Sequence, residues 1–390
     1  MQKRILISLV MCGLLFAAAP VVAAKEKPEP EPYRFKMVKE IPHTPVKNQY
    51  WTGTCWCFAT VSFLESETLR LGGPELDLSE MYVVRHTYPR KAENYIRLHG
   101  HANFEQGGQS HDVLEQVARF GIVPEADYPG MRINEKRHNH GEMVAVLQGM
   151  VDGVLKRRGR RVTPRWQEAL GAVLDIYLGV PPQAVNHEGN TMTPREFARD
   201  VARIVPENYV EFTSYTHHPF WTRVRLEIPD NWTYNADYFN LPMDEMMRIV
   251  DHALQNGYSV AWDGDVSEKF FSSRETGLGL VPQKDWEDMT RKEQERKLSE
   301  PIAEKEITQA MRQETFENFT TTDDHLMHIV GMANDQRGET FYYTKNSGGT
   351  VDRKFGGFLY MSAPYVQLKT ICIMVHKDAV PRDIRERFGL

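Results

Sequence analysis

The sequence has little of several features that mark special classes of protein. Four cysteines in 390 residues are too few for a small fold held together by disulfides. A net charge of −6 at pH 7 gives no basic excess, so no nucleic-acid partner is expected. After the N-terminus, no apolar run approaches the roughly 20 residues of a membrane span, so no integral span is expected there. Hydrophobic residues make up 41% and charged residues 26% of the chain, as in ordinary globular proteins.

The first 24 residues have the layout of a secretory signal peptide. Lys3 and Arg4 precede an apolar run over 5–19, and small residues end the segment. The apolar run is too short to cross a bilayer comfortably. We therefore expect a signal peptide over 1–24 and a secreted or periplasmic protein after its cleavage. The proline-rich, charged stretch that follows predicts a linker or N-terminal arm over 25–41.

Apolar periodicity predicts an α+β protein. Helical patterns dominate the first two thirds of the chain, most clearly over 54–71, 111–120 and 243–255. After residue 325, short apolar runs separated by Gly, Asn and Asp predict antiparallel strands over 328–333, 340–344, 356–361 and 370–375. We expect one domain over 42–390, with a helical lobe and its insertion over about 42–240 and a β-rich lobe over about 241–390.

The segment NQYWTGTCWCF (48–58) carries the clearest chemical signal. Cys55 follows a glycine-containing turn and begins a predicted helix, where free N–H groups and the helix dipole favour an anion and lower a thiol's pKa. Gln49 lies six residues upstream, from where its amide can donate a hydrogen bond to an oxyanion beside the sulfur. This combination favours a nucleophilic cysteine over a buried structural one. Cys57 and Cys372 are expected to be core residues.

A thiolate nucleophile needs a histidine to exchange its proton and a third group to orient that histidine. In the last third of the chain, DHLMHIVGM offers His325 at the start of one strand run, and KNSGG offers Asn346 at the end of the next. On neighbouring strands these side chains can meet. His328 is the alternative, but three residues along a strand it faces the opposite side. Asp323, Asp324 and the two histidines are metal ligands by residue type, yet no further cluster at zinc-like spacing accompanies them, so no metal is expected.

These motifs together resemble those of the papain-like cysteine peptidases. The pattern NQ-x5-C-W, then DHLMHIVGM, then KNSGG is similar to the bleomycin hydrolase/aminopeptidase C branch of that family. Intermediate stretches such as EQGGQSHDVLEQVARFGIVPEADYP and GYSVAWDGDVSEKF agree, so the resemblance covers about residues 42–385 in order. The six-residue spacing from His325 to Gly331 is the family's spacing after its catalytic histidine, which favours His325 over His328.

The resemblance implies a fold and a set of roles. The fold is a two-lobe papain-like α+β fold, with the cysteine on the helical lobe and the histidine and asparagine on an antiparallel β lobe. The implied roles are nucleophile for Cys55, acid/base for His325, orienting group for Asn346, oxyanion-hole donor for Gln49, and substrate binding for Gly107, Gly108 and Asp324. The family's reaction uses no metal or other cofactor.

The expected activity is that of an exported thiol-dependent peptidase that hydrolyses peptide bonds through an acyl-enzyme, in the aminopeptidase manner of the resembled branch. The alternatives are an endopeptidase of the same fold, a cysteine amidase, and an inactive homologue that only binds peptides. Peptides are the expected partners, and the branch forms six-membered rings, so a homo-hexamer is implied. Tails of that branch lie in the cleft, and the charges over 382–390 predict a short helix here.

One departure from the family bears on activity. The family usually has a tryptophan two residues after the asparagine, where it covers the His–Asn hydrogen bond, and here Gly348 stands in its place. This leaves a wetter and weaker bond unless another side chain substitutes. Tyr342, Tyr343 and Trp51 are the aromatic candidates.

Overall fold

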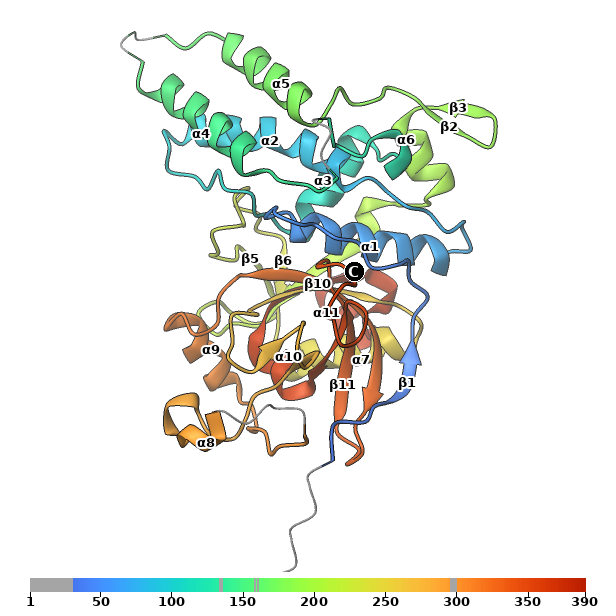
Figure 1. Cartoon of the computed structure of the whole chain (residues 1–390), viewed down its shortest axis with the longest axis vertical. Coiled ribbons are helices and arrows are strands. Elements are labelled where there is room, and N and C mark those ends of the chain that lie inside the picture. The colour runs from blue at the N-terminus through green and yellow to red at the C-terminus, as the bar shows by residue number, and fades with distance from the viewer. Residues whose placement is uncertain (1–30, 133–135, 158, 160, 295–299) are drawn as a thin grey trace, which may run out of the picture.

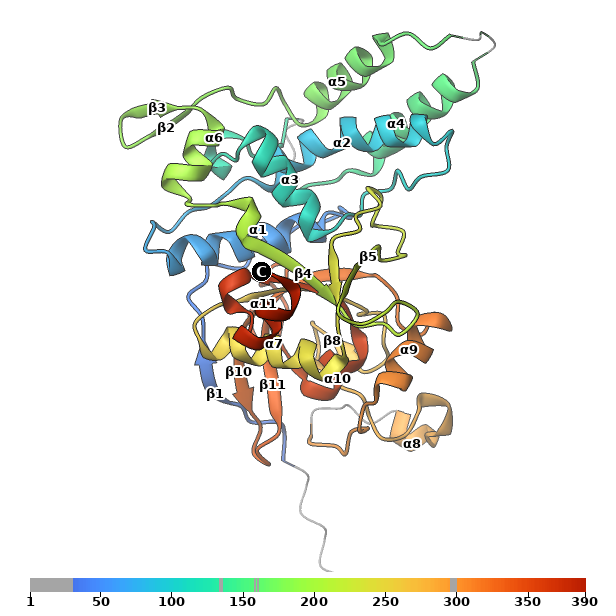
Figure 2. The same ribbon diagram turned by 180° about the vertical axis from the view of Figure 1, so that it is seen from behind.

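Two lobes lie on either side of one central helix. The computed structural model describes residues 31–132, 136–157, 159, 161–294 and 300–390, so the signal peptide predicted over 1–24 lies outside the described residues. Within that part, a helical lobe and a lobe built on a sheet are separated by α1 (Cys55–Arg70), drawn in blue in Figure 1. The view from behind in Figure 2 shows α1 between the lobes again.

Helices form most of the first lobe and cover the sheet of the second. Besides α1, the α-helices of the described residues are α2 (Glu80–Arg97), α3 (Ser110–Phe120), α4 (Gly141–Leu155), α5 (Arg165–Tyr177), α6 (Pro194–Glu196), α7 (Met243–Gln255), α8 (Arg291–Gln294), α9 (Gln309–Glu317), α10 (Ala363–Lys369) and α11 (Arg382–Phe388). Helix α2 begins at a serine cap, because the Ser79 side chain accepts a hydrogen bond from the backbone N–H of Tyr82.

The described strands form one large sheet and one small hairpin. The strands are β1 (Lys36–Glu40), β2 (Val185–His187), β3 (Asn190–Met192), β4 (Tyr209–Thr213), β5 (Thr222–Val224), β6 (Tyr238–Asn240), β7 (Val260–Gly264), β8 (Phe271–Ser272), β9 (Leu278–Gly279), β10 (His325–Asn334), β11 (Thr340–Lys345), β12 (Phe358–Ser362) and β13 (Thr370–His376). The large sheet has the order β5-β6-β4-β13-β7-β10-β11-β12-β9-β8, with β1 paired to β10, and β2 pairs with β3. Its central neighbours β7, β10 and β11 run antiparallel.

The central sheet is buried on both faces, and this fixes α1 in place. Along β10, Leu326 belongs to the core shared with the helical lobe, whereas Met327 and Ile329 belong to the core beneath α7. This alternation is the period of a strand covered on both sides. Helix α1 packs against β10 and β7 from one side and against α2 and α3 from the other. Every residue of α1 from Trp56 to Thr68 is buried, as expected for a helix enclosed all round.

The sequence predicts most of these elements, but strands of the large sheet also occur before residue 241, where the β-rich lobe was expected to begin. The helices predicted over 54–71, 111–120 and 243–255 are present as α1, α3 and α7, and the four predicted strands are present as β10 to β13. The sheet is not limited to the β-rich lobe expected over about 241–390, because β1 and β4 also belong to it. Strand β1 lies within the predicted N-terminal arm, and β4 to β6 precede residue 241, where the β-rich lobe was expected to begin.

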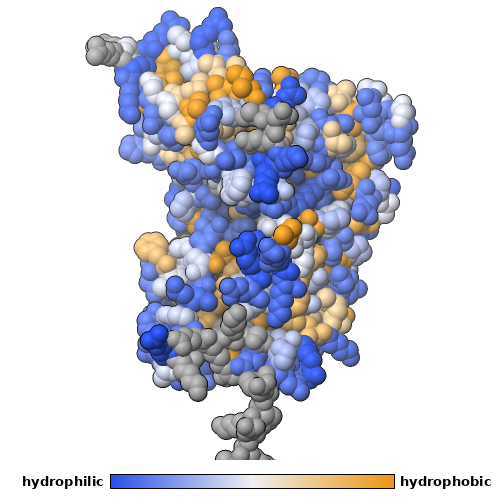
Figure 3. Space-filling model, in the orientation of Figure 1, coloured by the Kyte–Doolittle hydropathy of each residue, from blue (hydrophilic) through white to orange (hydrophobic). Residues whose placement is uncertain are grey.

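The surface carries one visible apolar area on the helical lobe. Figure 3 shows apolar side chains gathered over α4 and α5, where Val146 and Ile176 are exposed. Of the helices in the described ranges, none has both the length and the apolar character needed to cross a membrane.

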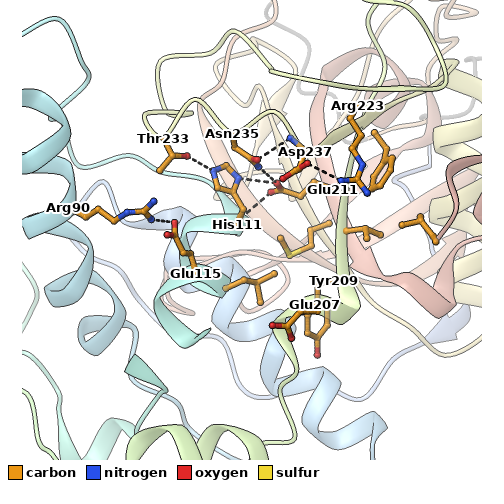
Figure 4. A pocket seen from close by; sticks show the side chains of 15 residues that line it. Arg90, His111, Glu115, Glu207, Tyr209, Glu211, Arg223, Thr233, Asn235 and Asp237 are labelled. Atoms are coloured by element: carbon orange, nitrogen blue, oxygen red, sulfur yellow. Dashed lines mark hydrogen bonds and ion pairs between the residues drawn. The ribbon is translucent and has the colours of Figure 1, made fainter. Parts of the chain in front are cut away.

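A buried ion pair joins the two lobes behind α1. His111, near the start of α3, faces Glu211 of β4 with 2.9 Å between Nδ1 and the carboxylate, and its Nε2 lies 3.1 Å from the Thr233 hydroxyl (Figure 4). Burial alone would lower the pKa of His111, but Glu211 and Asp112 raise it to about 9. The imidazole is therefore charged at neutral pH.

This pair predicts a stability that falls in alkaline solution. Because the folded pKa of His111 lies above its ordinary value of 6.5, its contribution is fully present below pH 6.5 and is lost as pH rises through about 9. We expect the unfolding free energy to fall by on the order of 1–3 kcal/mol across that interval. Thermal and urea unfolding at pH 6 and pH 9.5 measure it. His111→Gln should remove most of this pH dependence, and His101→Gln, at an exposed site, should retain it.

Candidate active site

Cys55 stands at the first position of α1, where the helix meets a loop of the helical lobe. The backbone N–H of Gly53 donates to Gln106 Oε1 at 2.8 Å, and the indole N–H of Trp56 donates to the Gln106 carbonyl at 3.0 Å. These two bonds hold residues 106–108 beside the start of the helix. The Cys55 thiol is half-buried and lies beside the backbone N–H of Leu326, the residue that follows His325 on β10. The two lobes therefore bring Cys55 and His325 to the same place.

The electrostatic surroundings of Cys55 differ from the sequence-based expectation. The pKa of the thiol is raised to about 12, chiefly by burial and also by the negative charges of Asp263 and Asp230, whereas the N–H of Leu326 lowers it. The prediction that the helix start lowers the thiol pKa is thus wrong for this site, because desolvation and nearby carboxylates outweigh the helix dipole. The thiol is neutral in the resting protein.

His325 and Asn346 meet as predicted. Strands β10 and β11 are antiparallel with His328 opposite Lys345, so Asn346, directly after β11, lies near the start of β10. The distance from His325 Nε2 to Asn346 Oδ1 is 2.8 Å. The backbone N–H of Ser347 donates to the same oxygen at 2.7 Å, which is consistent with its assignment as the amide oxygen. Since that oxygen only accepts, Nε2 carries the imidazole proton and Nδ1 is left as a base.

The pKa of the His325 imidazole is lowered, chiefly by burial. Burial lowers the pKa of His325 below its ordinary value, the hydrogen bond to Asn346 and the charge of Asp324 raise it, and the charge of Arg353 lowers it. With the raised thiol pKa of Cys55, this disfavours the charged form of both groups in the free protein.

The Arg353 guanidinium occupies the space where a side chain at residue 348 would begin, the position at which the family usually has a tryptophan. A β-carbon at residue 348 would collide with the Arg353 guanidinium, which donates to the Gly348 carbonyl at 3.0 Å and to Ser273 Oγ at 2.5 Å. A tryptophan here would have to displace the guanidinium. The three aromatic candidates make their contacts elsewhere. Tyr342 donates to Asp251, Tyr343 stacks on Phe358, and Trp51 is 62% exposed with Arg137 over its ring.

Gln49 is fixed between the helix start and the asparagine loop. Its backbone N–H donates to the Ser347 carbonyl at 2.9 Å, and its Oε1 accepts from Ser347 Oγ at 2.6 Å. Its Nε2 donates one hydrogen to the Thr52 carbonyl at 2.8 Å. The second hydrogen of this amide remains for a ligand near Cys55.

The two glycines predicted to bind substrate lie against bulky groups. A β-carbon at Gly107 would overlap the Asp230 carboxylate, and one at Gly108 would press on the Trp56 ring. The Gly107 carbonyl accepts from the buried Lys91 ammonium at 2.5 Å. Neither Asp230 nor Lys91 stood out in the sequence, because they come from a long loop and from the middle of α2.

The remaining acidic and histidine candidates have structural partners. Asp324 Oδ1 accepts from the Thr322 hydroxyl at 2.7 Å, and Oδ2 accepts from the N–H groups of Val266 and Ser267. Both carboxylate oxygens of Asp324 therefore already have hydrogen-bond partners within the protein. Its role in substrate binding stays a prediction. His328 is fully buried, with its Nδ1 2.9 Å from the Ser62 hydroxyl of α1, as expected for a core residue.

Of the residues that the structure describes, one group could hold a metal ion by residue type: His217, His218 and Glu227. Both Nε2 atoms approach the same Glu227 oxygen, at 3.3 and 2.8 Å. Gln313 donates to His217 Nδ1 at 3.0 Å, and the Thr216 N–H fixes that amide by donating to its oxygen. The His217 proton therefore sits on Nε2, pointing at Glu227, so this nitrogen is not free to bind a metal.

A pocket of about 660 Å³ lies apart from these residues, between α3 and β4 (Figure 4). Its walls include His111, Glu211 and the C-terminal Leu390, and none of the predicted site residues lines it. The short helix predicted over 382–390 is present as α11, with Ile384 and Phe388 packed in the core of the sheet lobe. The chain end thus contributes to this pocket.

Comparison with known proteins agrees with this geometry. Residues 172–389 match the model of the peptidase C1-like family, and residues 31–157 match that of the papain family cysteine proteases. The chain belongs to the peptidase C1-like family. It is a cysteine peptidase with the papain-like α+β fold, and the predicted resemblance to the bleomycin hydrolase and aminopeptidase C branch is confirmed.

Relatives of this peptidase cover most of its length. Cysteine proteinase 1, mitochondrial, from Saccharomyces cerevisiae is 22% identical over 91% of this chain and 79% of its own. Aminopeptidase C from Lactococcus lactis is 23% identical over 87% of this chain and 82% of its own. The crystal structure of PepW from Lactobacillus rhamnosis has the same fold, with a TM-score of 0.70 at 16% identity over 91% of this chain and 84% of that one.

The predicted secreted or periplasmic localisation is wrong, because the yeast relative that spans 91% of this peptidase is a mitochondrial protein. Residues 1–24 contain basic residues and no acidic residue. That composition occurs in secretory signals and in mitochondrial transit peptides alike, so it does not identify a compartment.

Asn346 provides a direct test of the His325 geometry. Asn346→Ala removes the acceptor that orients the imidazole, and we expect kcat to fall by about 10- to 100-fold, as for other misplacements of a catalytic group. Steady-state kinetics measures this, and circular dichroism checks the fold. Asn256→Ala, at the end of α7, should leave kcat unchanged. An unchanged kcat in Asn346→Ala would exclude Asn346 as the orienting group.

Arg353 provides a test of the pH dependence. Its charge lowers the pKa of His325, so Arg353→Gln should raise that pKa and move the acid limb of kcat/KM to higher pH. Activity at pH 5 should then fall relative to activity at pH 7. The matched control is Lys354→Gln, which removes a neighbouring exposed charge and should leave the limb in place. If the acid limb of kcat/KM is at the same pH in Arg353→Gln as in the wild type, Arg353 does not affect the pKa of His325.

Proposed function

We propose that this cysteine peptidase is an aminopeptidase that hydrolyses peptides through an acyl-enzyme formed on Cys55. The observation that supports this best is the 2.8 Å hydrogen bond between His325 Nε2 and Asn346, which leaves Nδ1 as a base on the strand that adjoins the Cys55 thiol. An inactive peptide-binding protein would have no need of this constellation. Arg353 beside Gly348 supplies a group where the family's tryptophan is absent, which also favours activity.

The proposed reaction has two steps. In acylation, Cys55 attacks the scissile carbonyl carbon while its thiol proton passes to His325 Nδ1, and His325 then gives this proton to the leaving amine. In deacylation, His325 Nδ1 takes a proton from water as the water oxygen attacks the thioester carbon. The C–S bond then breaks, and His325 returns the proton to the sulfur, which releases the acid and the free thiol. The N–H of Cys55 and the second amide hydrogen of Gln49 stabilise the oxyanion in both steps. Asn346 keeps the imidazole in the required tautomer.

Active-site labelling and turnover test this proposal. An epoxysuccinyl thiol inhibitor should add one label to the wild type, as measured by intact mass, and should abolish hydrolysis of an aminoacyl-aminomethylcoumarin substrate. Cys55→Ala should lose both label and turnover. Cys57→Ala should keep both, since Cys57 is buried with its thiol on the Glu80 carbonyl. Wild-type protein that takes up no label and releases no coumarin would instead indicate an inactive homologue.

A further inference from the structure

The loop that follows β5 carries a carboxylate into the active-site region. Asn103 holds the tip of this loop on the helical lobe, because its Nδ2 donates to the Pro229 carbonyl at 3.2 Å and to Asp230 Oδ1 at 2.8 Å. The Asp230 carboxylate fills the space in front of Gly107 that a β-carbon would need. Only glycine at 107 admits it.

Hydrogen bonds of the neighbouring residue place Gly107, and with it the Asp230 carboxylate, close to Cys55. Gly107 follows Gln106, which is bonded to Gly53 and Trp56 on either side of Cys55. The Asp230 charge is also near enough to raise the pKa of the Cys55 thiol. The carboxylate therefore stands on the helical-lobe side of Cys55, and His325 stands on the sheet side.

In the part of the chain that the structure describes, Asp230 Oδ2 has no hydrogen-bond or ion-pair partner. Oδ1 accepts from Asn103, and among the described residues no cation forms an ion pair with Asp230 within 4.0 Å. Burial raises its pKa and the Lys91 charge lowers it, but the Lys91 ammonium donates to the carbonyls of Glu105 and Gly107. Asp230 is only partly exposed. A half-buried carboxylate in this state is stabilised by a cation that arrives with a ligand.

The position of His325, the proposed proton donor, sets the direction in which a peptide substrate lies across the site. The leaving amine must lie near His325, so the acyl part of the substrate must extend to the other side of Cys55, toward Gly107. The α-nitrogen of an aminoacyl group is two bonds from the scissile carbonyl carbon, about 2.5 Å away. A second residue attached to that nitrogen would meet the Asp230 carboxylate, whereas an ammonium group would be attracted to it.

We propose that Asp230 is the specificity-determining residue of this peptidase: its free oxygen binds the α-ammonium group of a substrate's first residue and its bulk blocks longer acyl groups. The proposal rests on the proposed function and adds the group that restricts cleavage to free N-termini. The ligand chemistry is a primary ammonium, and its source is the α-amine and not a lysine side chain.

Kinetics on matched substrates tests the assignment. For the wild type, kcat/KM for a free-amine aminoacyl-aminomethylcoumarin should exceed that for its N-acetylated twin by at least about tenfold, the scale of a charge-assisted hydrogen bond. Asp230→Asn should lose most of this preference, chiefly through KM, while the acetylated twin is unaffected or improved. Asp237→Asn is the matched control in the same loop, where Asp237 pairs with Arg223 at the surface, and should behave as wild type. Epoxysuccinyl labelling of Cys55 in Asp230→Asn checks that the site is intact.

Three outcomes overturn the proposal. Equal turnover of both twins by the wild type does so while leaving the peptidase function in place, and so does an unchanged preference in Asp230→Asn. The third is a fall in kcat/KM of Asp230→Asn that appears only with an N-acetyl-lysyl-aminoacyl substrate. This result would show that the carboxylate binds the lysine side chain of the substrate's second residue and not its α-amine.

A binding measurement separates this proposal from failure of catalysis. Calorimetric titration of Cys55→Ala with a dipeptide amide and with its N-acetylated twin needs no turnover. The free-amine dipeptide should bind at least about tenfold more tightly, and Cys55→Ala combined with Asp230→Asn should remove the difference. Equal dissociation constants in Cys55→Ala would overturn the role of Asp230 whether or not the wild type hydrolyses peptides.

Discussion

The active site depends on a short backbone pairing between the lobes. The segment just before α1 pairs with the segment just after β11, with the Gln49 N–H on the Ser347 carbonyl at 2.9 Å and the Gly349 N–H on the Lys47 carbonyl at 3.1 Å. Gln49 lies six residues before Cys55, and Asn346 lies one residue before Ser347. These few bonds therefore set the relative positions of Gln49, Cys55 and Asn346, the residues proposed as oxyanion donor, nucleophile and orienting group.

A partly buried cluster of charged side chains around Lys47 lies next to this pairing. The Lys47 ammonium lies 2.9 Å from Glu65 of α1 and 2.8 Å from Glu80 of α2. Burial alone would lower the pKa of Lys47, but Glu80, Glu65 and Asp77 raise it well above its ordinary value. A buried cation with several partners tolerates few alternative positions. The cluster thus fixes the backbone of residue 47, and through it the crossing segment.

The parts of this site that sequence predicted are those set by local structure. Cys55 at a helix start, and His325 and Asn346 at strand ends, follow from turn and strand patterns together with the motifs around them. The groups that sequence missed, Asp230 and Arg353, come from loops. Their surroundings depend on where each loop packs against the rest of the protein, which local sequence patterns do not give. Asp230, for example, lies against Gly107 although 123 residues separate them in the sequence. The early strands were missed for a related reason, since three- to five-residue strands such as β6 and β4 carry too little periodicity to be recognised.

The proposed roles of Cys55 and Asp230 would be linked through charge. Burial is the main cause of the raised pKa of the thiol, and the charges of three carboxylates, those of Asp263, Asp230 and Asp323, raise it as well. An ammonium group bound at Asp230 would neutralise one of these charges at the moment when a substrate is in place. The thiolate would then cost less to form in the complex than in the free protein. A substrate with a blocked N-terminus would leave the charge of Asp230 uncompensated, so discrimination would act on the chemical step as well as on binding.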